Sequence, residues 1–137
     1  MERILHEYTL MFNVILKNRS ILIVDDVEDN RSLFGFYLKN TKATLLYAKN
    51  GKEAVDICNA DSTIDLVLMD MQMPVLNGIE ATREIRKFNQ QLPIIAVTAY
   101  AFPGDKQCCL DAGCNDYLTK PIDSDALIEM IKSFLAK

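Results

Sequence analysis

The sequence predicts an α/β domain built on a doubly wound parallel sheet, and three observations predict it. Five short apolar segments are typical of buried strands, an amphipathic segment typical of a helix follows each of them, and the connections are short. Strands that alternate with helices in this way form parallel sheets with helices on both faces and right-handed crossovers. The length of 137 residues, with 50% hydrophobic and 25% charged residues, fits one ordinary globular domain.

The first unit of this pattern is a strand followed by a helix. Ile-Leu-Ile-Val at 21–24 is a fully apolar strand. Asp29 and Asn30 are the expected N-cap residues of a helix that reaches about Asn40. The inward side chains of this helix are expected to be Leu33, Phe34, Tyr37 and Leu38.

The second and third units repeat the first. A strand is expected at 44–48 and a helix at 52–60, with an Asn-Gly turn between them. The third strand, at 66–69, is unbroken hydrophobe, as in a strand that is buried on both faces of a parallel sheet. Pro74 stops this pattern, and a helix at about 78–88 follows.

The last two units complete a sheet of five strands. A strand at 94–97 precedes a helix at 103–112, for which Gly113 is the expected C′ glycine. A short strand at 115–119 then leads to the final helix. That helix is expected to be capped by Asp123 or Ser124 and to face inward with Leu127, Ile128, Ile131 and Leu135.

Residues 1–19 form an N-terminal extension or linker before the regular pattern, and residues 20–137 form the domain. Apolar residues of the extension fall on one helical stripe, which favours an amphipathic helix. The stripe consists of Ile4, Leu5, Tyr8, Phe12, Ile15 and Leu16. Residues 9–16 fit an added strand equally well, and a plain linker is the third interpretation.

Composition excludes several classes of protein. A net charge of −4 without a Lys/Arg run argues against general nucleic-acid binding. The most apolar N-terminal stretch is far shorter than the roughly 20 residues that span a membrane, and it has no signal-peptide pattern. Four cysteines without a C-x-x-C pair, and a single histidine, disfavour a zinc site. Reduced thiols and a cytoplasmic location are therefore expected.

Polar residues follow four of the five predicted strands. The first strand ends in Asp25 and Asp26, the third in Asp70, the fourth in Thr98 and the fifth in Lys120. Parallel strands present their carboxyl ends at one edge of the sheet, where open α/β sheets bind ligands. If the strand order is 2-1-3-4-5, strands one and three are neighbours there. The five side chains are therefore expected to lie together.

These side chains suit phosphoryl transfer. Three adjacent carboxylates repel one another unless a cation is present, and oxygen ligands without His or Cys favour Mg²⁺. The ammonium of Lys120 and the hydroxyl of Thr98 suit the oxygens of a phosphoryl group. An anionic nucleophile, a divalent metal, an ammonium group and a hydroxyl group together indicate a phosphoryl-transfer site.

Four motifs resemble the receiver domain of two-component response regulators, over residues 20–137. They are Ile-Leu-Ile-Val-Asp-Asp (21–26), Leu-Met-Asp-Met-Gln-Met-Pro (68–74) followed by Gly78, Val-Thr-Ala (97–99) and Tyr-Leu-Thr-Lys-Pro (117–121). The resemblance implies a flavodoxin-like (βα)5 fold with strand order 2-1-3-4-5. The run from Asp25 to Arg31 also looks like receivers attached to hybrid sensor histidine kinases.

The resemblance assigns roles at the acidic edge, the edge of the sheet where Asp25, Asp26 and Asp70 are expected. It implies that Asp70 is the phosphoacceptor and takes a phosphoryl group from a phosphohistidine. Asp25 and Asp26, with Asp70 and the backbone carbonyl of Gln72, would hold Mg²⁺. The side chains of Gln72 and Tyr100 match the two variable positions that tune the lifetime of the phosphate.

Further roles fall at the ends of the last two strands. By resemblance, Thr98 and Lys120 bind the oxygens of the acyl phosphate, and Pro121 follows a cis peptide bond. Tyr117 matches an aromatic switch residue that rotates inward as Thr98 moves toward the phosphate. Such a domain is an enzyme only in promoting its own aspartyl phosphorylation and dephosphorylation.

The implied parent protein is a hybrid sensor histidine kinase, and the alternative is a stand-alone single-domain response regulator that acts through protein–protein contacts. The implied partner is a sensor histidine kinase or a histidine phosphotransfer domain. A homodimer is compatible with the sequence, whereas direct contact with nucleic acid or membrane is not expected.

Three other functions fit the sequence less well. An aspartyl phosphatase commonly has an acid two residues after its nucleophile, where this chain has Gln72, which cannot protonate a leaving group. A degenerate receiver that only binds proteins would lack an acid or the lysine, and none is missing. A nucleotide-binding domain would show G-x-G-x-x-G or a P-loop after the first strand, and neither occurs.

Overall fold

The computed structural model describes residues 16–99 and 103–135. The alternative expectations for residues 1–15 therefore fall outside the described residues, as does Tyr100. The described residues at the N-terminal side pack on the domain. Leu16 is fully buried, and the guanidinium of Arg19 donates a hydrogen bond to the carbonyl oxygen of Leu135 over 2.9 Å.

Strands and helices alternate along the chain, as predicted. They are β1 (Ser20–Val24), α2 (Glu28–Leu38), the 3-10 turn η1 (Lys39–Thr41), β2 (Thr44–Ala48), α3 (Gly51–Ala60), β3 (Leu66–Asp70), α4 (Gly78–Arg86), β4 (Ile94–Thr98), α5 (Pro103–Ala112), β5 (Asp116–Thr119) and α6 (Ser124–Leu135). All neighbouring strands pair in parallel, in the order β2-β1-β3-β4-β5. This order confirms the predicted doubly wound, flavodoxin-like sheet.

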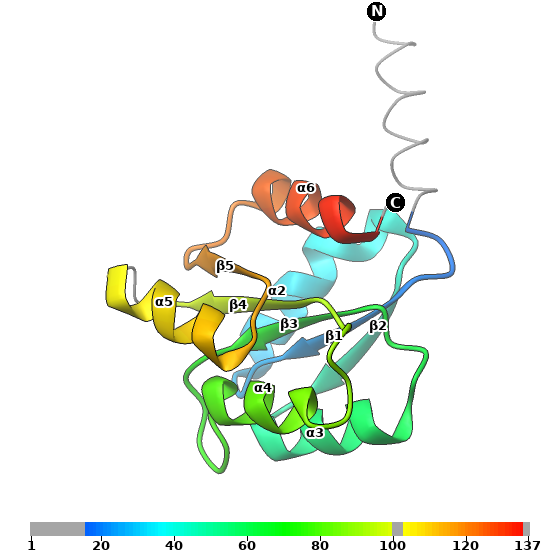
Figure 1. Cartoon of the computed structure of the whole chain (residues 1–137). Helices are drawn as coiled ribbons and strands as arrows, with labels where there is room; N and C mark the ends of the chain where they lie inside the picture. Colours follow the sequence, from blue (N-terminus) through cyan, green and yellow to red (C-terminus); the bar gives the residue numbers. More distant parts are fainter. Residues whose placement is uncertain (1–15, 100–102, 136–137) are drawn as a thin grey trace, which may run out of the picture.

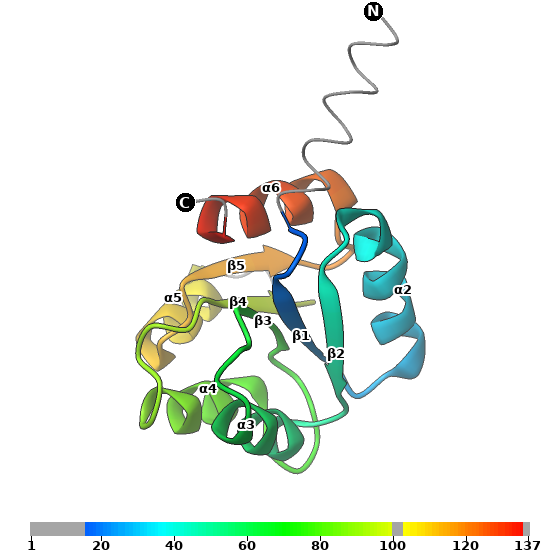
Figure 2. The same ribbon diagram turned by 90° about the vertical axis from the view of Figure 1, so that its right-hand side faces the viewer.

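The sheet lies between two layers of helices (Figures 1 and 2). Helices α2 and α6 cover one face, and α3, α4 and α5 cover the other. Side chains of the central strands alternate between the two cores, because successive residues of a strand point to opposite faces. Ile21, Ile23 and Leu68 lie in the core under α2 and α6, and Leu22 and Met69 lie in the other.

The predicted start of the first helix was wrong. Its N-cap is Val27, with no side-chain cap, so Asp29 and Asn30 lie inside the first turn. The side chain of Asp25 accepts a hydrogen bond from the backbone N–H of Val27 (2.9 Å). The N-cap therefore lies two residues before the predicted cap at Asp29. Leu33 was also misplaced, since it is 47% exposed.

Other helix ends follow local signals. The side chain of Asn50 caps α3 by accepting from the N–H of Glu53 (2.8 Å). Gly113 takes a positive φ of 118° directly after α5, which confirms the predicted C′ glycine. Within the described residues, no helix has the length and apolarity to cross a membrane.

The four cysteines are free thiols. Cys58, Cys109 and Cys114 are buried, whereas Cys108 is exposed on α5. Burial raises the pKa of Cys58 and of Cys109 to about 11 and also raises the pKa of Cys114. The three buried thiols therefore stay protonated and unreactive at neutral pH.

Candidate functional site

Asp70 is the last residue of β3 and is only 5% exposed. The strand is buried on both faces and delivers this carboxylate to the carboxyl edge of the sheet. Beyond it, the N–H of Met71 donates to the carbonyl of Val97 (3.0 Å), and the N–H of Gln72 donates to Oδ1 of Asp70 (3.2 Å). The following loop therefore orients the carboxylate.

Asp25 and Asp26 reach the same edge from β1. Strand β1 pairs with β3 in a register that sets Val24 opposite Met69, so the next residues along the two strands are Asp25 and Asp70. Asp25 is fully buried and Asp26 is exposed. The three carboxylates thus come from the ends of two neighbouring strands.

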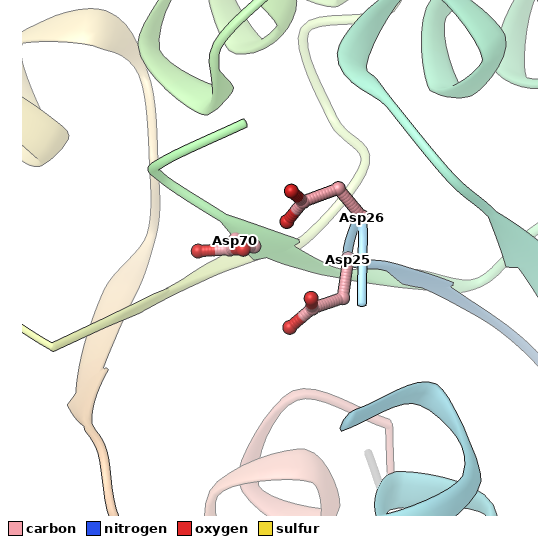
Figure 3. Close-up of side chains that lie close together, drawn as sticks. All are labelled: Asp25, Asp26 and Asp70. Atoms are coloured by element: carbon pink, nitrogen blue, oxygen red, sulfur yellow. The ribbon is translucent and has the colours of Figure 1, made fainter. Parts of the chain in front are cut away.

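Ligand oxygens of Asp25, Asp26 and Asp70 all lie within 4.8 Å of one another. Figure 3 shows the three carboxylates gathered where β1 and β3 end. This group contains oxygen donors and no histidine or cysteine, and three such donors at this spacing can hold a hard divalent cation. The three carboxylates therefore fit the side-chain ligands of the metal site expected from the sequence.

Lys120 completes the acidic edge from the end of β5. Its Nζ lies 3.2 Å from Oδ2 of Asp25 and 3.7 Å from Oδ1 of Asp70. Its backbone N–H donates to the carbonyl of Thr98 (2.8 Å), and the peptide bond to Pro121 is cis, as expected. The ammonium group therefore bridges the two buried carboxylates.

The surroundings of Asp70 raise its pKa to about 6. Burial is the main cause, and the charges of Asp25 and Asp26 add to it. The N–H of Gln72 and the ammonium of Lys120 act in the opposite direction. At neutral pH the carboxyl is mostly ionised, but its charge is poorly stabilised without a cation.

Thr98 ends β4, one residue beyond the Val97 that pairs with Asp70, and Tyr117 lies on β5 opposite Ala96. Thr98 is 3% exposed and, with Gln72, lines a pocket of about 160 Å³ between the sheet and α5. Tyr117 is half-buried against the core under α3, α4 and α5. Burial raises the pKa of its phenol, as do the nearby Asp105 and Cys109.

A family model of the response regulator receiver domain matches residues 21–132. This chain belongs to that family. It is a receiver domain of two-component systems, and its strand order is the one that the resemblance implied.

Two curated relatives of this receiver domain differ in how much of their length the chain covers. Hybrid signal transduction histidine kinase I of Dictyostelium discoideum is 39% identical over 127 residues, which are 87% of this chain but 7% of that protein. The polar-differentiation response regulator DivK of Brucella anthropi is 37% identical over 119 residues, which are 85% of this chain and 96% of that protein. The chain thus spans a small part of one relative and nearly all of the other.

Solved structures of receiver domains are also similar to this chain. One is the Saccharomyces cerevisiae complex of the histidine phosphotransfer protein Ypd1 with the receiver domain of Ssk1 (38% identity, TM-score 0.82, covering 88% of this chain and 90% of that one). Another is the receiver domain of the Pseudomonas aeruginosa sensor histidine kinase PA1611, with a magnesium ion in its active-site cleft (35% identity, TM-score 0.81, 88% and 99%).

Two residues that hold Asp25 were missed as site residues. The side-chain amide of Asn30 donates to Oδ1 of Asp25 (3.3 Å), and the guanidinium of Arg31 donates to the backbone carbonyl of Asp25 (2.8 Å). The sequence predicts Asn30 as a helix cap, but the N-cap is Val27. A helix that starts at Glu28 places both residues in its first turn, facing back toward the acidic pair.

Proposed function

We propose that this receiver domain accepts a phosphoryl group from a phosphohistidine onto Asp70, with Mg²⁺ bound at the acidic edge. The observation that carries the proposal is the convergence of three carboxylates within 4.8 Å beside the ammonium of Lys120. Asp25, Asp26, Asp70 and the backbone carbonyl of Gln72 would hold the ion. When bound, Mg²⁺ supplies positive charge that offsets the carboxylates and the incoming phosphoryl group.

Asp70 is the nucleophile. The N–H of Gln72 and the ammonium of Lys120 both contact Oδ1, which orients the carboxylate and leaves Oδ2 for attack. A bond forms between Oδ2 and phosphorus as the bond between phosphorus and the histidine nitrogen breaks. The electron pair of that bond goes to the imidazole.

Lys120 and Thr98 stabilise the product. The acyl phosphate carries more negative charge than the carboxylate, which draws the ammonium of Lys120 and the hydroxyl of Thr98 toward the phosphoryl oxygens. Tyr117 is the residue that changes position as Thr98 moves. Gln72 and Tyr100 tune the lifetime of the phosphate by limiting the attack of water.

The α2 face is the surface that fits the phosphohistidine partner. A pocket of about 210 Å³ joins α2 to the end of β5, with Leu33 and Tyr37 on one side and Lys120 and Ile122 on the other. Phe36 on the same helix is 63% exposed. The Ssk1 receiver in complex with a histidine phosphotransfer protein supports a histidine phosphotransfer domain as the partner of this chain, and a sensor histidine kinase is the other proposed partner.

The parent protein is proposed to be a hybrid sensor histidine kinase of the cytoplasm, with the receiver starting at residue 20. The resemblance to the Dictyostelium discoideum kinase supports this assignment. DivK, which this chain covers almost completely, supports the stand-alone alternative. A homodimer stays a prediction.

Intact-mass measurement tests the phosphoacceptor. Wild-type protein incubated with acetyl phosphate and Mg²⁺ is expected to gain one phosphoryl group, and Asp70→Asn none. Asp56→Asn is the matched control, because Asp56 is an exposed carboxylate whose contact is with Lys52 on the surface of α3. Equal labelling of Asp70→Asn and wild type would falsify the proposal. A phosphorylated histidine phosphotransfer protein used as the donor tests the partner class.

A further inference from the structure

The β2–α3 turn, defined here as residues 48–51 from the last residue of β2 to the first residue of α3, contacts the chain after β1 and after β3 but supplies none of the three carboxylates. On one side, the carbonyl of Ala48 accepts from the backbone N–H of Asp25 over 3.1 Å. On the other, the backbone N–H of Gly51 donates to the carbonyl of Leu76 over 3.1 Å. The turn therefore connects the loop after β1 to the loop after β3 through main-chain hydrogen bonds.

The loop after β3 needs such an anchor, because it contains a strained turn. The N–H of Leu76 donates to the carbonyl of Pro74 (2.9 Å), which closes a three-residue turn with Val75 at φ 74°. Positive φ is unfavourable for a β-branched residue, and strained backbone persists only where its surroundings hold it. Val75 itself is 78% exposed and receives little support from packing.

Only glycine fits at position 51. A Cβ atom on Gly51 would lie 2.1 Å from the carbonyl oxygen and 2.8 Å from the carbonyl carbon of Leu76. Both are backbone atoms, so a larger residue can be accepted only if the loop or the turn moves. The turn is itself fixed at the start of α3, where the N–H of Ala54 donates to the carbonyl of Asn50 (3.1 Å). A larger residue at position 51 therefore displaces the loop after β3 relative to the turn.

We propose that Gly51 is a positioning residue for the metal-binding edge, holding the β3–α4 loop through Leu76 so that the Gln72 carbonyl and Asp70 keep their places beside Asp25. This inference rests on the proposed function. Mg²⁺ demands near-ideal geometry from its ligands, so a small loop displacement weakens binding. Residues that orient metal ligands typically cost about 10- to 100-fold in metal affinity when they are changed.

Calorimetric titration of Mg²⁺ into Gly51→Ala and wild-type protein tests the proposal. The affinity of Gly51→Ala is expected to fall about 10- to 100-fold. Gly104→Ala is the matched control, since a Cβ there meets nothing within 4 Å, and it should bind like wild type. Wild-type protein that binds no Mg²⁺ overturns the proposed function and this inference with it. Normal wild-type binding with unchanged affinity in Gly51→Ala overturns the inference alone.

Hydrogen exchange in the wild-type protein gives an answer even if Gly51→Ala does not fold. If the hydrogen bond from Gly51 to Leu76 favours Mg²⁺ binding, bound Mg²⁺ must equally favour this hydrogen bond, because coupling between two equilibria is reciprocal. Saturating Mg²⁺ is therefore expected to slow exchange of the Gly51 amide more than that of Asp61. The Asp61 amide donates to the carbonyl of Ile57 (2.9 Å) at the other end of α3 and reports general stabilisation. Equal slowing of the two amides contradicts the proposal.

Discussion

Two aspartates flank the same strand and have opposite surroundings. Asp65, just before β3, accepts a hydrogen bond from the N–H of Ser20 (2.8 Å) and lies 3.7 Å from the guanidinium of Arg19, at the half-exposed amino end of the sheet. Asp70, at the carboxyl end, is buried close to two other carboxylates, and its pKa is raised to about 6. The surroundings of Asp65 stabilise its charge, whereas those of Asp70 disfavour its charge, which is typical of a functional site.

The largest difference is expected in the pH dependence of folding. The raised pKa means that, between about pH 4 and pH 6, folded Asp70 holds a proton that the unfolded chain releases. The stability that protonated Asp70 contributes to the folded state is therefore fully present below pH 4 and is lost as the pH rises through 6. Asp70→Asn is expected to increase the free energy of unfolding by about 3 kcal/mol at pH 7 and by little at pH 4.

Urea unfolding of both proteins in chelator, at pH values from 4 to 7, measures this effect. Wild-type protein in saturating Mg²⁺ serves as a control, since a bound cation should remove most of the difference. If the increase in the free energy of unfolding of Asp70→Asn does not vary with pH, the surroundings of Asp70 do not destabilise its charged form.

The second difference concerns metal affinity. Asp26→Ala removes one of three carboxylates whose oxygens lie within 4.8 Å, and Mg²⁺ affinity is expected to fall about 100-fold. Asp65→Ala removes the same charge from the other end of the sheet and should leave affinity unchanged. Calorimetric titration of both variants separates local ligation from a general effect of net charge, and equal losses would count against the site.

The smallest difference is the stability that Asp65 itself contributes. Asp65→Asn weakens a hydrogen bond to Ser20 and removes a surface ion pair with Arg19, so the free energy of unfolding is expected to fall by about 1 kcal/mol. Phosphorylation of Asp70 should be retained in this variant. Urea unfolding at pH 7, combined with labelling by acetyl phosphate, measures both. Loss of labelling would mean that the two ends of the strand are coupled.

The strands and the acidic group could be predicted from sequence because they depend on short-range patterns and on topology. Unbroken apolar runs such as 66–69 are typical of buried parallel strands, and parallel strands bring their carboxyl ends together. The start of α2 could not be predicted, because it depends on a contact between Asp25 and the N–H of Val27. Leu33 was placed inward by helical spacing, but it lies exposed beside the pocket at the end of β5.

Main-chain contacts were also beyond sequence analysis. The Asn-Gly pair at 50–51 predicted a turn, and in the structure Asn50 is the N-cap and Gly51 the first residue of α3. Nothing in the residue types indicates that Gly51 contacts the carbonyl of Leu76. Likewise, the sequence predicted that Lys120 lies with the three aspartates, but not that its ammonium is closer to Asp25 than to Asp70. Distances of this kind follow from how the loops pack, and loop packing has no periodic signature.

The distribution of the four thiols makes this domain ready for site-specific labelling without any cysteine being removed. Cys108 is exposed, whereas the other three are buried and have raised pKa values. Cys108 also lines the pocket that contains Gln72 and Thr98. A fluorophore or spin probe attached to Cys108 would therefore report on the edge of the sheet where phosphorylation is proposed, without any substitution in the sequence.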